Sequence, residues 1–420
     1  MSTGAAQDLD VLVVGGGPVG ACAAALLARC ARGGPALRVG LLQAAATAPP
    51  LHGPEPDARV LAFSRASERI LEAAGAWNRV RDHAWPYEHM RVWHPGVAPA
   101  SDEVLQFDAA EVGEPNLGYI IEAHRVTAAL MEAFAEAGGE LIGGEVLGPD
   151  TVADVAGPVR LATSAGERLA QLVVGADGAR SAVRTAFGIG VRTHSYRQTA
   201  IVARVLPEKP HQRTAWQRFI AGGTLALLPC GDGSVSIVWS LEERQAGGLL
   251  DATPAQFESR LMQDSDAVLG ALRLAGPRLA FPLQRLSAER YIAGRCVLVG
   301  DAAHVVHPLA GQGVNLGLLD AAVLAQLCVE ARAAGEYLGA PRTLRAYERW
   351  RRGENALMEF SIDAFNRVLA QGAGPLAGLA RRALALANRS AVLKRFFIGH
   401  ALGRPPDLTA WESDPASPRR

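Results

Sequence analysis

Three short apolar runs along the chain each end in a turn that contains glycine. They cover residues 11–14, 172–174 and 297–299. Unbroken apolar runs of this length are typical of strands that are buried on both faces of a parallel sheet. An alanine-rich apolar stretch at 21–31 follows the first run and predicts a helix, and a further apolar run follows at 38–42. Together these segments have the order and size of a βαβ unit.

The pattern changes between residues 190 and 283, where apolar and polar positions alternate. The segments 200–205 and 234–239 show this alternation, and turns rich in Gly and Asp separate such segments. A period of two residues predicts strands with one buried face, so we expect an antiparallel sheet here. Beyond Gly313 the chain is mostly helical in pattern to about residue 400.

Composition excludes several classes of protein. The chain has 420 residues, 49% hydrophobic and 20% charged, and its 42 basic and 42 acidic side chains give zero net charge. A disordered chain would be less hydrophobic. A dedicated nucleic-acid-binding protein would carry a positive field, so nucleic acid is not expected as a partner. The 5 cysteines form no C-x-x-C pair, which predicts reduced thiols and no metal site, and no signal peptide is evident, which predicts a cytoplasmic protein.

The first glycine turn, GGGPVG, fits the G-x-G-x-x-G pattern of dinucleotide-binding folds. In that pattern the first glycine permits a tight turn, the second lets the backbone approach a diphosphate, and the third lets helix and strand pack closely. The start of the helix also presents free N–H groups and a partial positive charge. Gln43 stands where the pattern has an acid that binds the ribose hydroxyls. The residues expected at the diphosphate are Gly15, Gly17, Pro18, Val19 and Gly20.

Two later turns follow the other two apolar runs. Asp177 and Gly178 form the second motif, and Gly300 and Asp301 form the third. The carboxylate of Asp301 is placed to accept a hydrogen bond from a polyol hydroxyl. A loop with glycines at 311–313 then opens a helix, so its first N–H groups would face an acceptor atom with the helix dipole behind them.

The three motifs, in this order and at these separations, resemble those of the single-component FAD-dependent aromatic hydroxylases that share the para-hydroxybenzoate hydroxylase fold. The string GDAAHVVHPLAGQGVNLGLLD at 300–320 is the most specific part. Within that group, DARVLAFSRAS at 57–67, AWQRF at 215–219 and LALLP at 225–229 resemble segments of the ubiquinone-biosynthesis hydroxylases. The resemblance covers nearly the whole chain, from about residue 8 to about residue 400.

This resemblance implies an α/β fold, α+β over the chain as a whole. It consists of a discontinuous Rossmann-like FAD-binding domain, an inserted antiparallel-sheet domain for the substrate, and a helical C-terminal region. The implied boundaries are 8–75, 110–185 and 285–340 for the FAD-binding domain, 76–109 and 186–284 for the substrate domain, 341–404 for the C-terminal helices, and 405–420 for a disordered tail.

The resemblance also implies a reaction. Monooxygenases of this family take electrons from NAD(P)H, use O₂ as co-substrate, and transfer one oxygen atom from a flavin hydroperoxide to an electron-rich ring. The expected substrate is a polyprenylated phenol or benzoquinol of ubiquinone biosynthesis. Two alternatives stay open: a hydroxylase of a soluble aromatic compound, and a non-catalytic flavoprotein that scaffolds a quinone-synthesis complex.

Carried onto this sequence, the family's motifs mark candidate site residues. His307, Pro308 and Arg59 are expected beside the flavin ring as catalytic residues. The expected cofactor contacts beyond the first motif are Gln43, Arg59, Arg125, Asp177, Gly178, Gly300, Asp301, Pro308, Gly311, Gln312, Gly313, Val314 and Asn315. The expected substrate wall is Trp216, Phe219, Leu227, Pro229 and Trp239.

A basic stretch lies near the C-terminus, at 376–404. It carries six basic residues and no acidic one, interleaved with large apolar residues. Such a stretch is typical of a helix that lies on an anionic membrane surface, which would suit a prenylated substrate and a peripheral position at the inner face of a membrane. A solvated helix face packed on the domain, and a contact between subunits of a homo-oligomer, are the alternatives.

Overall fold

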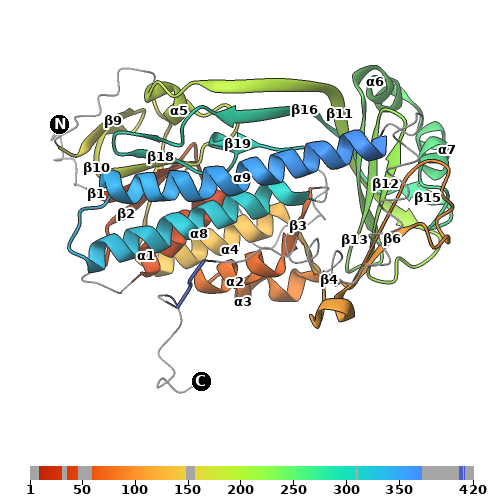
Figure 1. Cartoon of the computed structure of the whole chain (residues 1–420), viewed down its shortest axis with the longest axis horizontal. Helices are drawn as coiled ribbons and strands as arrows, with labels where there is room; N and C mark the ends of the chain where they lie inside the picture. Colours follow the sequence, from red (N-terminus) through yellow and green to blue (C-terminus); the bar gives the residue numbers. More distant parts are fainter. Residues whose placement is uncertain are drawn as a thin grey trace.

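The structure is a computed structural model that describes residues 9–30, 36–45, 59–147, 157–307, 311–370, 406–409 and 411, with the backbone alone over 362–370. Figure 1 shows two bodies along the long axis of the molecule. One is a mostly parallel sheet covered by long helices, and the other is a twisted, mostly antiparallel sheet with two helices on its outer side. The buried residues form a large core in the first body and a separate core in the second.

The first sheet is built from the apolar runs that the sequence marks. Its order is β17–β18–β10–β1–β2–β8, and β9 pairs with β10. These strands are β1 (Leu9–Val14), β2 (Val39–Gln43), β8 (Glu140–Gly143), β9 (Val159–Thr163), β10 (Gly166–Gly175), β17 (Ile292–Ala293) and β18 (Cys296–Leu298). Because β18, β10, β1, β2 and β8 run parallel, their carboxyl ends meet at one edge of the sheet. The three glycine motifs follow three neighbouring strands at that edge, where ligands of such sheets bind.

Long helices pack on this sheet, with α1 between α4 and α8, and with α9 beyond α8 (Figure 1). The helices of this body are α1 (Pro18–Arg29), α2 (Arg65–Ala73), α3 (Trp77–Val80), α4 (Ala123–Glu136), α5 (Ala182–Ala186), α8 (Gln312–Ala333) and α9 (Pro341–Ala370). All residues of α1 from Gly20 to Ala28 are buried, because its alanines let three neighbours approach closely. Helix α8 is long and apolar enough to cross a membrane, yet 72% of its apolar window is buried inside the protein, as in a core helix.

The second sheet has the order β19–β16–β11–β14–β13–β12–β5–β6, and β15 pairs with β11. These strands are β5 (His89–Trp93), β6 (Leu105–Asp108), β11 (Val191–Pro207), β12 (Thr214–Ile220), β13 (Gly223–Pro229), β14 (Val235–Glu242), β15 (Leu272–Leu274), β16 (Leu279–Ala288) and β19 (His304–Val305). Helices α6 (Glu243–Asp251) and α7 (Pro254–Asp264) cover its outer face, where Trp239 and Phe257 pack edge to face at 5.5 Å. The opposite face is directed toward the first body.

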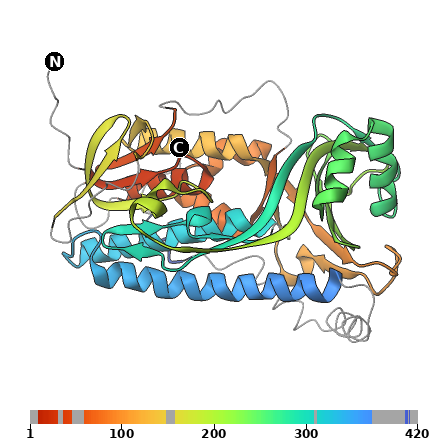
Figure 2. The ribbon, with the colours of Figure 1, turned by 90° about the horizontal axis from the view of Figure 1, so that it is seen from above.

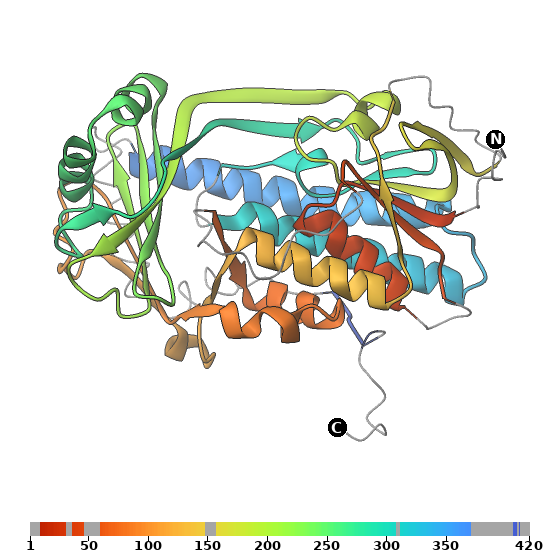
Figure 3. The same cartoon turned by 180° about the vertical axis from the view of Figure 1, so that it is seen from behind.

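A small sheet of β3 (Val60–Ser64), β7 (Gly118–Glu122) and β4 (Trp85–Tyr87) lies between the two bodies. Single 3₁₀ turns occur at η1 (Arg81–His83), η2 (Ala109–Val112) and η3 (Gly300–Ala302). The long antiparallel pair β11 and β16 runs from the first body into the second sheet, which Figures 2 and 3 show clearly. Helix α9 contacts both β17 and β12, so it also joins the two bodies. These connections fix the inner face of the second sheet opposite the carboxyl edge of the first.

The predicted fold class is confirmed, since a parallel sheet carries the three motifs and residues 200–205 and 235–239 belong to an antiparallel sheet. The domain boundaries stay a prediction. The basic stretch 376–404 lies outside the described residues. Within the segment 405–420, the indole N–H of Trp411 donates to the carbonyl oxygen of Leu26 at 2.8 Å, and its ring packs on the main core.

Candidate functional site

The first glycine motif forms a turn that only glycine fits at two positions. Gly15 has φ = +111°, and a Cβ there would collide with the carbonyl oxygen of Ala176. A Cβ on Gly20 would collide with the carbonyl oxygen of Gly15. At Gly17, by contrast, a Cβ would meet no described atom within 4 Å. The turn is therefore closed against the sheet and open on the side from which a ligand would approach.

The first turn of α1 faces the same open side. Gly17 is its N-cap and Pro18 its first residue, no described side chain caps it, and it holds no acidic residue. Its free N–H groups and the partial positive charge of the helix end suit an anion such as a diphosphate. Gln43, at the end of β2, places its side-chain oxygen so close to Gly16 that a Cβ there would collide with it. Gln43 therefore lies against the turn, at the edge where the ribose position was expected.

The third motif interlocks with the first through Val19. A Cβ added to Gly317 of α8 would lie 2.5 Å from Val19 Cγ2, and one added to Gly300 would lie 3.1 Å from Val19 Cγ1. Gly300 also has φ = +59°, in the left-handed region. The glycines thus let α1, the Gly300 turn and α8 pack at short distance, and Asp301 follows directly at the rim of the space they leave.

A fully buried aspartate on α8, Asp320, holds the third motif in place. Its Oδ2 accepts the N–H of Gly300 at 3.0 Å and a bond from His304 Nε2 at 2.6 Å, and its Oδ1 accepts from Arg351 Nε at 2.6 Å. Although burial opposes ionisation, His304 and the guanidinium of Arg351 hold the pKa of Asp320 well below its usual range. The carboxylate is therefore ionised and only accepts, so His304 Nε2 carries a proton. Sequence reasoning gave Asp320 no role, although an aspartate within a buried apolar helix was a usable signal.

The second motif is tied to the third by an arginine. The side chain of Arg184 donates to the carbonyl oxygen of Ala302 at 2.9 Å and to that of Ala179 at 2.7 Å. Asp177 accepts bonds from the Ser181 hydroxyl and from the N–H of Val183, and so supports the start of the short helix α5, whose N-cap is Ser181. Both carboxylate oxygens of Asp177 therefore have partners within the chain. A contact of Asp177 or of the adjacent Gly178 with a cofactor stays a prediction.

The start of α8 is anchored to β3 by Asn315. Its Nδ2 donates to the carbonyl oxygens of Ala62 at 2.9 Å and Gly311 at 3.0 Å, and its Oδ1 accepts from the N–H of Ser64 at 2.9 Å and the hydroxyl of Ser67 at 2.6 Å. Asn315 therefore positions the loop and the helix. Gly311, the N-cap of α8, has φ = +63°, and no described side chain caps this helix either. The first N–H groups of α8, from Gln312, Gly313 and Val314, are the second uncapped helix start of the site.

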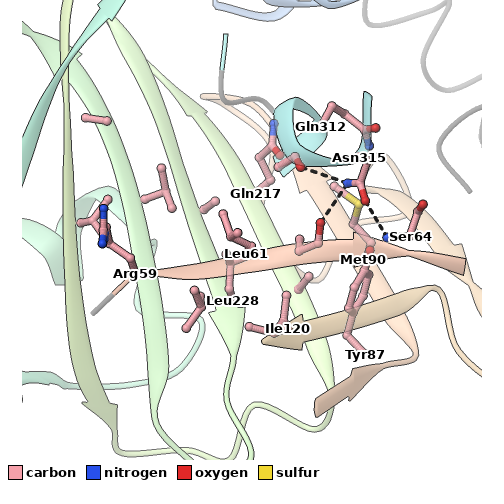
Figure 4. A pocket seen from close by; sticks show the side chains of 18 of the residues that line it. Arg59, Leu61, Ser64, Tyr87, Met90, Ile120, Gln217, Leu228, Gln312 and Asn315 are labelled. Atoms are coloured by element: carbon pink, nitrogen blue, oxygen red, sulfur yellow. Dashed lines mark hydrogen bonds between the residues drawn. The ribbon is translucent and has the colours of Figure 1, made fainter. Parts of the chain in front are cut away.

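A cavity of about 490 Å³ lies between the α8 start, β3 and the inner face of the second sheet (Figure 4). Most of its wall is aliphatic or aromatic. Its side chains come mainly from Leu61, Ala62, Met90, Phe107, Leu117, Ile120, Ala200, Val202, Ala215, Ala226, Leu228, Val238, Phe281 and Leu283, and its polar ones from Arg59, Ser64, Tyr87, Gln217, Asp301, Gln312 and Asn315. Arg59, Phe281 and Asp301 are exposed, so they mark where the cavity reaches solvent.

The phase of the strands corrects the predicted substrate wall. Ala226, Leu228 and Val238 line the cavity, whereas the predicted Leu227 and Trp239 lie on the other face, in the core beneath α6 and α7. Successive side chains of a strand point to opposite faces, so a choice one position off selects the wrong side. Sequence alternation showed two faces here but not which of them was covered by helices.

The remaining three wall residues lie in different surroundings. Trp216 contributes to the lining, although its ring packs edge to face on Trp93 at 6.0 Å. Phe219 is fully buried against Leu316 of α8 and does not line the cavity. Pro229 is buried at the end of β13 and is also not part of the lining. Of the five predicted wall residues, only Trp216 contributes to the lining, and its ring lies on the face of the sheet that also carries Leu227, with which it pairs.

The predicted catalytic and flanking residues also lie in different places. Arg59 lines the cavity. His307 is 2% exposed and outside the lining, with Nε2 at 3.2 Å from Gln198 Oε1, so its side chain contacts β11 instead of the cavity. Arg125 does not line the cavity either, and it forms an ion pair with buried Glu122. Pro308 lies outside the described residues.

Two ionisable groups at the cavity have shifted pKa values. Burial raises the pKa of the Tyr87 hydroxyl to about 12, so this group is neutral at physiological pH. Loss of water around the carboxyl group of Asp301 raises its pKa above the usual range. The charge interaction with His304 partly offsets this effect. An ionised Asp301 therefore gains from any ligand hydroxyl that donates to it.

The residues present fit the FAD that the motifs predict. Two uncapped helix starts offer N–H donors, Gly17 leaves space for the close approach of a diphosphate, and Asp301 offers an acceptor at the rim of an elongated site. The first and third motifs form these features, and with the second motif they follow neighbouring strands. The adjoining apolar cavity leaves room for a second ligand beside the start of α8.

Comparisons with known proteins agree with this arrangement. A family model described as an FAD binding domain matches residues 8–353. The chain is 35% identical over 415 residues to the ubiquinone hydroxylase UbiL of Rhodospirillum rubrum, covering 96% of this chain and 91% of the relative. It is 34% identical over 404 residues to the 3-demethoxyubiquinol 3-hydroxylase of Escherichia coli, covering 94% and 99%. It is 30% identical over 449 residues to the mitochondrial ubiquinone biosynthesis monooxygenase COQ6 of Danio rerio, covering 95% and 91%.

Solved structures show the same fold. The p-nitrophenol 4-monooxygenase PnpA of Pseudomonas putida superposes with a TM-score of 0.73 at 19% identity, over 93% of this chain and 97% of that one. PqsL of Pseudomonas aeruginosa, a probable FAD-dependent monooxygenase, superposes with a TM-score of 0.71 at 22% identity, over 90% and 99%. At these identities the likeness shows the fold alone.

Proposed function

The chain belongs to the FAD-dependent monooxygenase family that contains the ubiquinone-biosynthesis hydroxylases, and from this membership we propose that it hydroxylates the ring of a polyprenylated phenol or benzoquinol in ubiquinone biosynthesis. The relatives that are named as ubiquinone hydroxylase or ubiquinone biosynthesis monooxygenase match nearly the whole chain at 30–35% identity. Their names therefore support this substrate class. The observation that carries the proposal is the cavity beside the α8 start, whose wall is apolar on the sheet side and on β3.

The size and polarity of the cavity suit such a substrate. A volume of about 490 Å³ accommodates an aromatic ring with part of an apolar chain. The exposed Phe281 at the rim is an apolar side chain that a prenyl tail would cover on its way out. Burial of that tail would stabilise the complex by about 25 cal/mol per Å² of apolar surface removed from water. A small charged aromatic compound would find few partners along this wall.

The chain's own residues would bind FAD and position the ring. We propose that Gly15, Gly17, Pro18, Val19 and Gly20 receive the diphosphate, that Gln43 lies at the ribose end, and that Asp301 accepts from the ribityl chain. The N–H groups from Gln312 to Val314 would stabilise negative charge at the start of α8. When bound and reduced, FAD supplies the reaction with O₂ that provides the electrophilic oxygen atom. The apolar wall excludes water from the site, and Arg59 lies at its rim.

Several finer features belong to the same proposal. NAD(P)H would be the electron donor and O₂ the co-substrate. The FAD-binding part would comprise 8–75, 110–185 and 285–340, and the substrate part 76–109 and 186–284. The enzyme would work in the cytoplasm at the surface of the membrane that holds its substrate, with the basic stretch 376–404 as the contact. A quinone-biosynthesis complex and a homo-oligomer are further partners that this location would favour.

The quinone intermediates of cells that lack this gene test the proposed function. Mass spectrometry of lipid extracts should show one prenylated ring that lacks a hydroxyl group, and its fragmentation should identify the position. Complementation with the wild-type gene should remove that intermediate. An unchanged profile in a strain with no second hydroxylase would contradict the proposal and favour a soluble aromatic substrate.

A further inference from the structure

Gln217 is a polar side chain on the otherwise apolar sheet wall of the cavity. It lies on β12, is 6% exposed, and lines the cavity. The other sheet side chains directed into the cavity from β11, β13 and β14 are Ala200, Val202, Ala226, Leu228 and Val238. In the part of the chain that the structure describes, no group hydrogen-bonds the carboxamide of Gln217. The N–H and C=O groups of the Gln217 carboxamide therefore face the cavity.

A carboxamide in such a position has an energetic cost unless water or a ligand in the cavity pairs with it. A buried polar group without a hydrogen bond costs about 1–3 kcal/mol in proteins. Leucine or methionine would fill the same space without that cost, as Leu228 does on the neighbouring strand. The carboxamide therefore gives the apolar wall a point at which a polar atom of a ligand can form a hydrogen bond.

The neighbours of Gln217 leave space in front of its side chain. It pairs with Ala226 on one side and with Val92 on the other. Figure 4 shows the side chain of Gln217 directed toward the first turn of α8, near Gln312 and Asn315. The carboxamide of Asn315 is already hydrogen-bonded to β3, to Ser67 and to the carbonyl oxygen of Gly311. It therefore does not pair with the carboxamide of Gln217. Gln217 thus offers its hydrogen bonds at the end of the cavity where the cofactor ring is proposed.

We propose that Gln217 hydrogen-bonds an oxygen substituent of the substrate's aromatic ring and so positions the ring beside the start of α8. This inference rests on the proposed function, because it assigns one residue of that site to the polar part of an otherwise apolar substrate. The carboxamide accepts from a phenol or quinol hydroxyl and donates to a carbonyl or ether oxygen. A ring without an oxygen substituent leaves the carboxamide unpaired, so the site rejects it.

Two probes and two matched variants test this assignment on the FAD-loaded enzyme. The probes are 2-geranylphenol and geranylbenzene, which share the apolar chain and differ in the ring hydroxyl. Gln217→Met removes the hydrogen bonds at similar size. Gln284→Met makes the same substitution on β16 at an exposed position outside the cavity. Calorimetric titration gives the dissociation constants, so the readout does not depend on turnover.

The wild type and Gln284→Met should bind the phenol about tenfold more tightly than the hydrocarbon, which is the upper end of what one net hydrogen bond gives. Gln217→Met should bind the two probes within about twofold of each other, mainly through weaker binding of the phenol. Equal preference in Gln217→Met and wild type would overturn the assignment while leaving the proposed function intact. A wild type that binds neither probe would contradict the proposed function, and the assignment with it.

A second variant decides the question if Gln217→Met does not load FAD. Gln217→Glu keeps the size and still accepts from a phenol, but its carboxylate repels the ether oxygen of 2-geranylanisole. Its preference for the phenol over this methyl ether should therefore exceed that of the wild type by about tenfold or more. Unchanged preference in Gln217→Glu would overturn the assignment.

Discussion

The backbone N–H of Gly300 donates to Oδ2 of Asp320 across 3.0 Å, so the turn of the third motif is held by a carboxylate on the helix that follows it. The same carboxylate joins His304 and Arg351 of α9, and all three side chains are buried. The buried cluster of Asp320, His304 and Arg351 therefore holds the turn that carries Asp301 in place. Helix α9, which also contacts β12, couples this turn to the second sheet.

Asp320→Asn should destabilise the protein by about 3–5 kcal/mol, because it removes the buried partner of Arg351 and leaves that buried charge only its ion pair with the exposed Glu354. The free energy of unfolding from urea titration of the apoprotein measures this. Asp82→Asn, at an aspartate whose side chain is 86% exposed, is the matched control and should change stability by less than about 0.5 kcal/mol. Equal stability of the two variants would show that the cluster does not anchor the turn.

The same aspartate predicts a pH dependence. Its pKa is lowered on folding, so its stabilising contribution is fully present above the unfolded-state pKa of about 3.9 and is lost as pH falls through the lower folded value. Between pH 5 and pH 3 the wild type should therefore lose more stability than Asp320→Asn. Urea titrations of both proteins across this range provide the comparison, and parallel curves would contradict the assignment.

Two glycines of the first motif should respond differently to alanine. Gly20→Ala places a Cβ against the carbonyl oxygen of Gly15 and should cost about 1–3 kcal/mol of stability through overpacking. Gly17→Ala meets no described atom within 4 Å, so the apoprotein should keep its stability while FAD binds about tenfold or more weakly. Unfolding of the apoprotein and fluorescence titration with FAD separate the two effects. Undiminished FAD affinity in Gly17→Ala would place the diphosphate elsewhere.

Asp301→Asn should separate stability from cofactor binding. The pKa of Asp301 is raised in the folded protein, so its ionised form disfavours folding above the ordinary pKa of an aspartate, and removing the charge should stabilise the apoprotein at neutral pH. FAD should bind more weakly, because an amide is a poorer acceptor than a carboxylate for a hydroxyl donor. Melting temperature and FAD dissociation constant are the measurements. A loss of apoprotein stability would show that Asp301 has a structural role.

Adjacent residues of β13 provide a test of the two faces of the sheet. Leu227→Ala should cost about 2–5 kcal/mol, since it opens a cavity in the core beneath α6 and α7. Leu228→Phe should leave folding nearly intact and weaken binding of 2-geranylphenol about tenfold or more, because it fills the cavity. Calorimetric titration and urea unfolding report on both. The reverse outcome would place the substrate on the other face.

Sequence reasoning found the parts of the site that depend on local chain geometry. Apolar runs that end in glycine predicted the parallel strands and the turns at Gly15 and Gly300, because those turns require glycine wherever the chain folds back on a strand. It did not find the cavity wall. Alternation along β13 and β14 shows that two faces exist, but only the position of α6 and α7 decides that Leu227 is covered and Leu228 is open.

Long-range contacts were also beyond the sequence. Asp320 binds Arg351, which is 31 positions away in the sequence. Gln217 lies on the second sheet and faces the start of α8. His307 belongs to the same segment as Gly300 and Asp301, yet it packs on Gln198 of β11, a contact that no local pattern encodes. The features that the sequence predicts well are turns whose geometry is set within one strand, and the side chains it misplaces are those whose position depends on packing between elements.

Transfer of an oxygen atom from O₂ to a prenylated phenol tests the central claim most directly. The purified protein would be loaded with FAD, reduced chemically, and mixed with 2-geranylphenol and isotopically labelled ¹⁸O₂. We predict a hydroxylated product that contains one ¹⁸O atom on the ring, at a yield that rises with the amount of reduced enzyme. Reoxidation of the FAD with hydrogen peroxide as the sole product, and unchanged phenol, would contradict the account.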